Sequence, residues 1–330
     1  DKSASIYAQI AADRVEDITF EDIDILGSLN GGIRVSDMLG DVTLRYVRII
    51  RKPGTRNLLS TISDALHLMN IRGCVVMEDC VIEAAGDDCL NIGAQRDNIV
   101  KLAASDKRTV TLRSTDNWYY YYTIREGDRL QFLDTVSKRV LGVRTVTAAA
   151  FNPRNRAHTV TLDQGVPGLA PERAQVMNLN HITRSMVIRN NTITPCTRNA
   201  LLARAQNMVV EGNKVDCSQG GVIGLNLSYA SGQDDAQLRN VRVAGNTFIC
   251  PGNVGLVALR PYRDEDGVPD TRDIKLIDNV FPVGAALAMR ISGVQTLKSR
   301  GNTFKQNGIP VKDASRFTLV SKCVDVEVEH

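Results

Sequence analysis

The segment SMVIRNNTI at residues 185–193 is followed, 22 positions later, by NMVVEGNKV at residues 207–215. Both alternate apolar and polar residues, as β-strands do, and both end in a polar turn and a short second strand. The pattern also occurs at residues 17–25, 41–49, 74–82, 240–248 and 273–281, and a looser copy ends at residues 302–304. Apart from one interruption, the ends of successive copies lie 22 to 33 residues apart. This period predicts a solenoid.

A second short apolar segment follows each copy, at residues 32–35, 65–68, 89–92, 200–203, 221–225, 255–259 and 285–289. These segments have no helical period, so we predict an all-β fold, a right-handed parallel β-helix. Asparagine also occupies the same place in five successive copies: Asn191, Asn213, Asn246, Asn279 and Asn302. Amides stacked about 4.8 Å apart can hydrogen-bond along the axis, and Asn tolerates the left-handed turn expected there.

The interruption predicts a separate domain. Alternating runs at residues 109–112, 128–132, 141–146 and 158–162 are separated by glycine- and proline-containing turns, which is typical of a small antiparallel β-barrel or sandwich. We therefore divide the chain into a first part of the β-helix (1–96), an inserted barrel domain (97–178) and a second part of the β-helix (179–330). The aromatic run WYYYY at residues 118–122 lies inside the insertion, where its rings either pack or contact a sugar.

Composition excludes several classes of function. The net charge is +3 with 23% charged residues, so we expect neither nucleic acid nor a membrane surface as partner. No apolar run approaches the roughly 18 residues that a spanning helix needs. The seven cysteines show no metal-binding spacing, and we interpret them mostly as small buried hydrophobic residues.

Two near-copies, SDALHL at residues 63–68 and GDDCLNI at residues 86–92, concentrate the acidic groups. Aligned, Asp64 matches Asp88 and His67 matches Asn91. If the strands stack in register, Asp64 and Asp88 lie about 4.8 Å apart with Asp87 beside them. Carboxylates this close repel, so at least one should have a raised pKa, which gives a site an acid and a base at one pH. We therefore predict that all three aspartates are catalytic.

In the next repeat Arg198 aligns with Asp87. The polar side chains expected to bind a substrate around the aspartates are Arg34, His67, Asn91, Arg198 and Asn199. Simpler interpretations remain open from the sequence. Gly-Asp-Asp can be a solvated turn, the aspartates can hold Ca²⁺, and Arg198 can form a salt bridge with Asp87 and nothing more.

These motifs resemble those of two glycoside hydrolase families. SDALH and GDDCLNI are similar to the polygalacturonases of family 28, but TRNAL at residues 197–201 lacks their Gly-His-Gly segment, and their Arg-Ile-Lys is missing. The closer resemblance is to the α-1,3-galactosidases of family 110. It includes the Asp…His and Gly-Asp-Asp pair, the inserted barrel, and the segments VIRNNTI (187–193) and VVEGN (209–213). It covers roughly residues 15 to 250, and Ala230 stands where that family has Glu.

The resemblance implies an exo-acting glycoside hydrolase that releases terminal α-1,3-linked galactose with inversion. Asp64, Asp87 and Asp88 would supply acid and base, and no metal or cofactor would be needed. The partner would be an oligo- or polysaccharide with terminal galactose, and the location secreted or periplasmic. The family has a longer N-terminal stretch, so we expect that this chain lacks its first coils. Rival hypotheses are a family-28-like hydrolase, a Ca²⁺-dependent lyase on an acidic or sulfated galactan, and a non-catalytic carbohydrate-binding β-helix.

Overall fold

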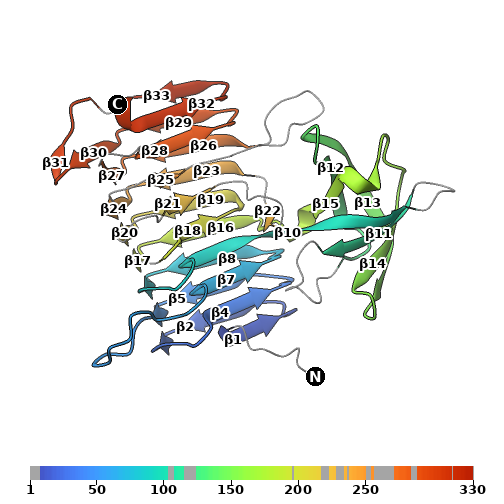
Figure 1. Cartoon of the computed structure of the whole chain (residues 1–330), viewed down its shortest axis with the longest axis horizontal. Coiled ribbons are helices and arrows are strands. Elements are labelled where there is room, and N and C mark those ends of the chain that lie inside the picture. The colour runs from blue at the N-terminus through green and yellow to red at the C-terminus, as the bar shows by residue number, and fades with distance from the viewer. Residues whose placement is uncertain are drawn as a thin grey trace.

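The computed structural model describes residues 8–102, 108–114, 124–194, 197–216, 223–227, 234–235, 238–249, 254–255, 271–283, 288–313 and 315–329. Within these ranges the regular structure is all strand apart from three 3₁₀ turns, Pro171–Arg173, Leu179–His181 and Ser315–Phe317. The strands stack as coils along one axis, with the termini at opposite ends and a second unit beside the stack (Figure 1). No helix in these ranges is long and apolar enough to cross a membrane.

Each coil contributes strands to parallel sheets. The first sheet runs β1 (Ala8–Asp13), β4 (Gly31–Ser36), β7 (Leu66–Met69), β10 (Leu90–Leu102), β18 (Asn199–Ala203), β21 (Ile223–Asn226). The second runs β2 (Ile18–Glu21), β5 (Val42–Arg45), β8 (Cys74–Glu78), β16 (Ser185–Arg189), β19 (Gln206–Glu211), β23 (Arg239–Ala244), β26 (Arg272–Ile277), β29 (Leu297–Arg300), β33 (Val326–Val328).

The third sheet runs β3 (Asp24–Ile25), β6 (Arg48–Ile49), β9 (Val81–Ile82), β17 (Thr192–Ile193), β20 (Lys214–Asp216), β24 (Thr247–Ile249), β27 (Val280–Pro282), β30 (Thr303–Gln306), and β31 (Ile309–Pro310) pairs with β30 in antiparallel orientation. Towards the C-terminus a small sheet pairs β25 (Val254–Gly255), β28 (Met289–Ser292), β32 (Thr318–Ser321). The coils on either side of the interruption pair directly, because Cys74 lies opposite Ser185. The insertion therefore leaves the stack continuous.

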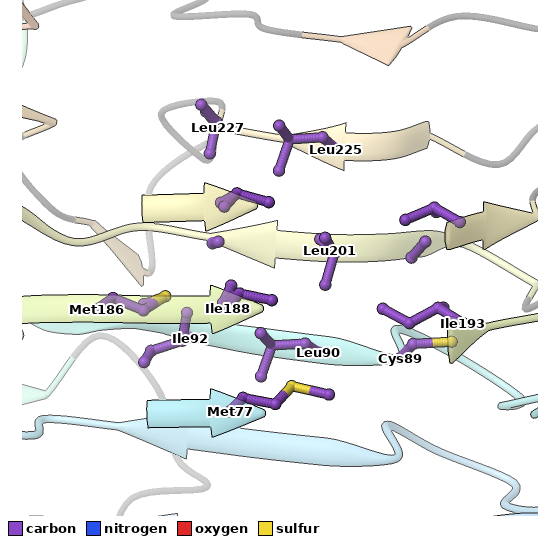
Figure 2. Packing of buried hydrophobic residues seen from close by; sticks show 14 of the residues in the cluster. Met77, Cys89, Leu90, Ile92, Met186, Ile188, Ile193, Leu201, Leu225 and Leu227 are labelled. Carbon is purple, nitrogen blue, oxygen red and sulfur yellow. The ribbon is translucent and has the colours of Figure 1, made fainter. Parts of the chain in front are cut away.

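The core fills the space between the sheets. Side chains from the first and second sheets pack against one another there, among them Met77, Leu90, Ile92, Met186, Ile188, Leu201 and Leu225 (Figure 2). Leu90, Ile188 and Leu201 are fully buried, and each such side chain contributes about 1.5–3 kcal/mol. A single coil cannot bury its own apolar face, so stacking supplies the stability.

The asparagine ladder is formed as predicted. Asn213 Nδ2 donates to Asn246 Oδ1 at 2.9 Å, and Asn246 Nδ2 donates to Asn279 Oδ1 at 2.9 Å. Backbone N–H groups join the ladder, because Asn246 N also donates to Asn279 Oδ1 at 3.1 Å. One part of the prediction is wrong. The left-handed residue is the one before each ladder asparagine, with φ of 57° at Asn190 and 62° at Gly245, so the ladder amides are selected for hydrogen bonding.

The inserted unit is a closed six-stranded antiparallel barrel. Its strands pair in the order β10, β11 (Thr109–Ser114), β14 (Ala157–Leu162), β13 (Arg139–Asn152), β12 (Arg129–Asp134), β15 (Ala174–Asn178), and β15 returns to β10. β10 belongs to both units, because its first residues pair with β7 and its later ones with β11 and β15. The domain boundary predicted at residue 97 therefore falls inside one continuous strand.

A buried ion pair fastens the barrel to the coils. Arg72, in the turn after β7, donates from Nη1 and Nη2 to Asp128 Oδ1 and Oδ2 at 2.6 and 2.7 Å. Asn178 Nδ2 donates to the same carboxylate at 2.7 Å. These bonds, with that from the Arg125 backbone, outweigh the burial of Asp128 and lower its pKa. The barrel is thus held in a fixed position beside β7 and β10.

The predicted fold class is confirmed. β15 and the full length of β10 were not predicted. Cys80 and Cys89 are buried, as expected, whereas Cys74 and Cys323 are partly exposed. The aromatic run at 118–122 and the other three cysteines lie outside the described residues.

Candidate active site

The site is built where β7, β10 and β18 begin. Leu66 lies opposite Leu90 and His67 opposite Asn91, which is the predicted register. Leu90 in turn lies opposite Leu201. Gly86 permits this close stacking, because a Cβ there would lie 2.5 Å from Ile62 O. The glycine of Gly-Asp-Asp is therefore required by the approach of the preceding coil.

Asp64, Asp87 and Asp88 are brought together. One oxygen from each carboxylate lies within 4.8 Å of the others. Asp64 and Asp88 are buried, with 6% and 3% of their surface exposed, whereas the Asp87 side chain is 32% exposed. At this spacing the negative charge of Asp64 raises the proton affinity of Asp87 and of Asp88.

Asp88 is held from the following coil. Its Oδ1 accepts hydrogen bonds from Asn199 N at 2.8 Å and from Asn199 Nδ2 at 2.7 Å. Asn199 Oδ1 accepts one from Asn226 Nδ2 at 3.0 Å, which fixes the amide. Burial, followed by the charge of Asp64, nevertheless raises the pKa of Asp88 to about 6. Asp88 therefore changes charge close to neutral pH. Asn199 was predicted to bind substrate, and in the structure its backbone and side chain bind the Asp88 carboxylate.

Asp87 is paired with Arg198, as the alignment of repeats predicted. Arg198 Nη1 lies 3.2 Å from Asp87 Oδ1 and 3.5 Å from Oδ2. Burial and the charge of Asp64 raise the pKa of Asp87, and the Arg198 guanidinium opposes that rise. The Arg198 side chain is 67% exposed, so the pair is solvated and adds little to stability.

Asp64 connects the two near-copies. With its proton on Nδ1, His67 donates to Asp64 Oδ2 at 2.5 Å, and Asn91 Nδ2 donates to the same oxygen at 3.3 Å. Asp64 Oδ1 accepts from Asp88 N at 3.2 Å. His67 and Asn91 thus face the carboxylates, and Arg34 lies opposite His67 in the preceding coil.

Arg204 belongs to this site and was not predicted. It is 1% exposed, and its Nη2 donates to Asn91 Oδ1 at 2.8 Å while Nε donates to Ile92 O at 3.2 Å. A guanidinium only donates hydrogen bonds, so the Asn91 side chain is oriented with its oxygen facing Arg204. The Asn91 amino group is thereby directed at Asp64.

The surroundings of the carboxylates suit proton transfer better than a hard cation. Ca²⁺ takes six to eight oxygen ligands. Here Asp64 Oδ2 and Asp88 Oδ1 already accept two N–H bonds each, from His67 and Asn91 and from Asn199. Groups that donate to carboxylates hold them in place for acid–base work, and they compete with a metal for the same lone pairs.

A recess of 240 Å³ is lined by residues of the two segments that lead into Asp87 and Arg198. Its wall includes Ala85 and Thr197, which lie close before Asp87 and directly before Arg198 in the chain. Thr197 Oγ1 donates to Gly86 O and ties the two wall segments together. The loop after β6 supplies Leu58 and Leu59 on the other side.

No family model matches the chain. Curated relatives do. Alpha-1,3-galactosidase A of Akkermansia muciniphila is 24% identical over 281 residues, which are 83% of this chain and 46% of that protein. The protein of that name from Peterkaempfera griseoplana is 24% identical over 324 residues, 91% of this chain and 43% of its own. The chain is similar to proteins named α-1,3-galactosidase.

The resemblance predicted from the motifs is thus confirmed, and the chain spans less than half the length of these relatives. Among solved structures, the tailspike protein gp49 from Pseudomonas phage LKA1 matches at 9% identity with a TM-score of 0.28, over 91% of this chain and 56% of that one. A score this low supports no argument. Ala230, where the sequence departs from the galactosidase pattern, lies outside the described residues.

Proposed function

We propose that the protein is an exo-acting glycoside hydrolase that removes α-1,3-linked galactose from the end of a glycan. The observation that supports this most is the cluster of Asp64, Asp87 and Asp88 with oxygens within 4.8 Å, in which two members have raised pKa values. Relatives named α-1,3-galactosidase supply the sugar and the linkage. From the same resemblance we also propose a secreted or periplasmic location.

Asp87 is assigned as the general acid. A general acid must reach the leaving oxygen, and Asp87 is the most exposed of the three carboxylates. Its raised pKa keeps the proton available at higher pH than an ordinary aspartate does. In the reaction the bond between the anomeric carbon and the leaving oxygen breaks, and the Asp87 proton passes to that oxygen.

Asp64 and Asp88 are assigned to the attacking water. Oxygens of Asp64 and Asp88 lie within 4.8 Å of each other, and two acceptors at that limit can both bind one water at about 2.8 Å, given an angle near 120° at the water. The water oxygen bonds to the anomeric carbon, and its proton passes to this carboxylate pair. Inverting enzymes usually separate acid and base by about 6.5–9.5 Å and retaining ones by about 5–5.5 Å. Inversion at this site therefore requires that the attacking water is bound by Asp64 and Asp88. It does not require space for a water between these two carboxylates and Asp87.

Exo-action is proposed because the chain closes one side of the site. β10 leaves the coils after Gly93 and enters the barrel, and β22 (Asp234–Asp235) pairs with it at Ala94 and Gln95. A long glycan would meet this wall beyond His67 and Asn91. We assign these two side chains, with Arg34 and Arg198, to the hydroxyls of the terminal sugar.

A substrate panel tests the proposal. It contains α-1,3-, α-1,4- and α-1,6-galactobiose, a β-galactoside and an α-digalacturonide, each with and without a chelator. We expect free galactose from the α-1,3-linked disaccharide, unaffected by chelation. Products absorbing in the ultraviolet and lost with chelator would establish a lyase instead. Cleavage of the digalacturonide alone would establish a polygalacturonase, and binding without product a carbohydrate-binding protein.

Proton NMR of the first product settles the stereochemistry. Inversion predicts that β-galactose appears first and mutarotates later. If α-galactose appears first, one of the carboxylates acts as a nucleophile, and the assignment of Asp64 and Asp88 to water is wrong.

A further inference from the structure

We propose that the recess beside Asp87 is the subsite that binds the leaving-group sugar, and that it takes a neutral hexose. The proposal rests on the proposed function, because the leaving-group sugar is located from the assignment of Asp87 as the general acid. The recess has a volume of 240 Å³, which is below the roughly 300–1,000 Å³ of pockets for drug-sized ligands and suits a single sugar ring.

The position of the recess follows from the chemistry of Asp87. The oxygen that accepts the acid's proton stays with the leaving sugar, so that sugar must lie next to the acid. Ala85 and Thr197 belong to the recess wall, and they lie two residues before Asp87 and one residue before Arg198 in the chain. The opposite direction along the strands leads to His67 and Asn91, which face Asp64.

The lining indicates an uncharged ligand. Arg51 and Glu83 are its charged members, and they pair with each other, Arg51 Nε lying 3.0 Å from Glu83 Oε1. Their charges cancel, while their remaining lone pairs and N–H groups can bind hydroxyls. An acidic sugar such as a galacturonate would gain no net attraction here, unlike in a basic subsite.

Two leucines supply an apolar wall. Leu58 is 83% exposed and Leu59 37% exposed, both on the loop after β6. The loop is fixed at its ends, because Arg51 N donates to Glu83 Oε2 at 3.3 Å and Ser60 N donates to Ala84 O at 2.9 Å. A held loop with exposed leucines offers the C–H face of a sugar ring a surface that is already ordered.

The test compares two substrates that share the galactose and differ in the leaving group. α-Galactosyl fluoride leaves the recess empty, whereas α-1,3-galactobiose fills it. Leu58→Ala should lower kcat/KM for galactobiose about 5-fold and leave that for the fluoride unchanged. Ile309→Ala is the matched control, because Ile309 is 70% exposed on β31 at the far end of the coils. Equal effects of Leu58→Ala on both substrates, or none on galactobiose, would overturn the subsite.

A binding measurement separates this proposal from the proposed function. In the Asp87→Asn variant, methyl-labelled leucines are titrated with galactobiose. The Leu58 and Leu59 methyl signals, assigned by their alanine variants, should shift, and those of the exposed Leu319 on β32 should not. Shifts in the variant, together with no hydrolysis of either substrate by the native protein, would retain the subsite and reject the hydrolase. Hydrolysis by the native protein without these shifts would retain the hydrolase and reject the subsite. If neither hydrolysis nor shifts are observed, both proposals are rejected.

Discussion

Replacing Asn199 by alanine should move the acid limb of the pH–activity profile to higher pH. Asn199 Nδ2 donates to Asp88 Oδ1 at 2.7 Å, and this bond favours the ionised carboxylate. A hydrogen bond to a charged group is worth about 1.5–3 kcal/mol, and 1.36 kcal/mol corresponds to one pKa unit. The pKa of Asp88, about 6 in the native protein, should therefore rise to between about 7 and 8.

The magnitude depends on pH in a defined way. Asp88 must be ionised to act on water, so at pH 5 the variant should be about 10- to 100-fold less active than the native protein, and near pH 9 about equally active. The assay is kcat/KM for α-1,3-galactobiose between pH 4 and 9. Asn226→Ala is the matched control, because Asn226 Nδ2 donates to Asn199 Oδ1, and its loss should shift the limb less. A loss of equal size at every pH would refute a role for Asp88 ionisation.

Three further predictions concern stability and positioning. Asp37 is buried and has a pKa raised to about 7, so the folded state binds more protons between about pH 4 and 7 and stability falls as pH rises through that range. Asp37→Asn should therefore raise the free energy of unfolding at pH 8 by about 4 kcal/mol at most, and change it little at pH 4. An equal change at both pH values contradicts this. Asn246→Ala should lower the free energy of unfolding by about 3–5 kcal/mol in denaturant titrations, because it breaks the buried ladder. Asn240→Ala, at an exposed position, should lower it by under about 1 kcal/mol. Similar losses in the two variants would show that the ladder does not stabilise the fold. Arg204→Met should lower kcat about 10-fold or more with a smaller change in KM, because Asn91 loses its fixed orientation. Arg204→Lys should restore part of the lost kcat. Unchanged kcat in a folded Arg204→Met variant would make Arg204 purely structural.

The coil register and the carboxylate cluster could be predicted because the repeat fixes both. Apolar residues at 66 and 68 and at 90 and 92 must face the same core, so the register has no freedom to slip. Asp64 and Asp88 precede these residues by equal numbers of positions. Their proximity follows from that alignment and from the spacing of strands.

Arg204 and the path of β10 could not be predicted in the same way. Arginine at the end of an apolar segment is usually solvated, and its burial depends on Gly93 in the neighbouring coil, where a Cβ would lie 3.2 Å from the Arg204 guanidinium. β10 changes partners from coil to barrel while its backbone stays extended, so no turn residue marks the change. Both features depend on contacts between segments far apart in sequence.

Activity of the aspartate variants on α-1,3-galactobiose tests the central claim most directly. Asp87→Asn and Asp88→Asn should each lower kcat by about 10²–10⁴-fold in chains that remain folded by circular dichroism. Asp24→Asn, which removes an exposed carboxylate paired with Arg48 on the third sheet, should leave kcat unchanged. Folded Asp87→Asn and Asp88→Asn variants with full activity would contradict the account.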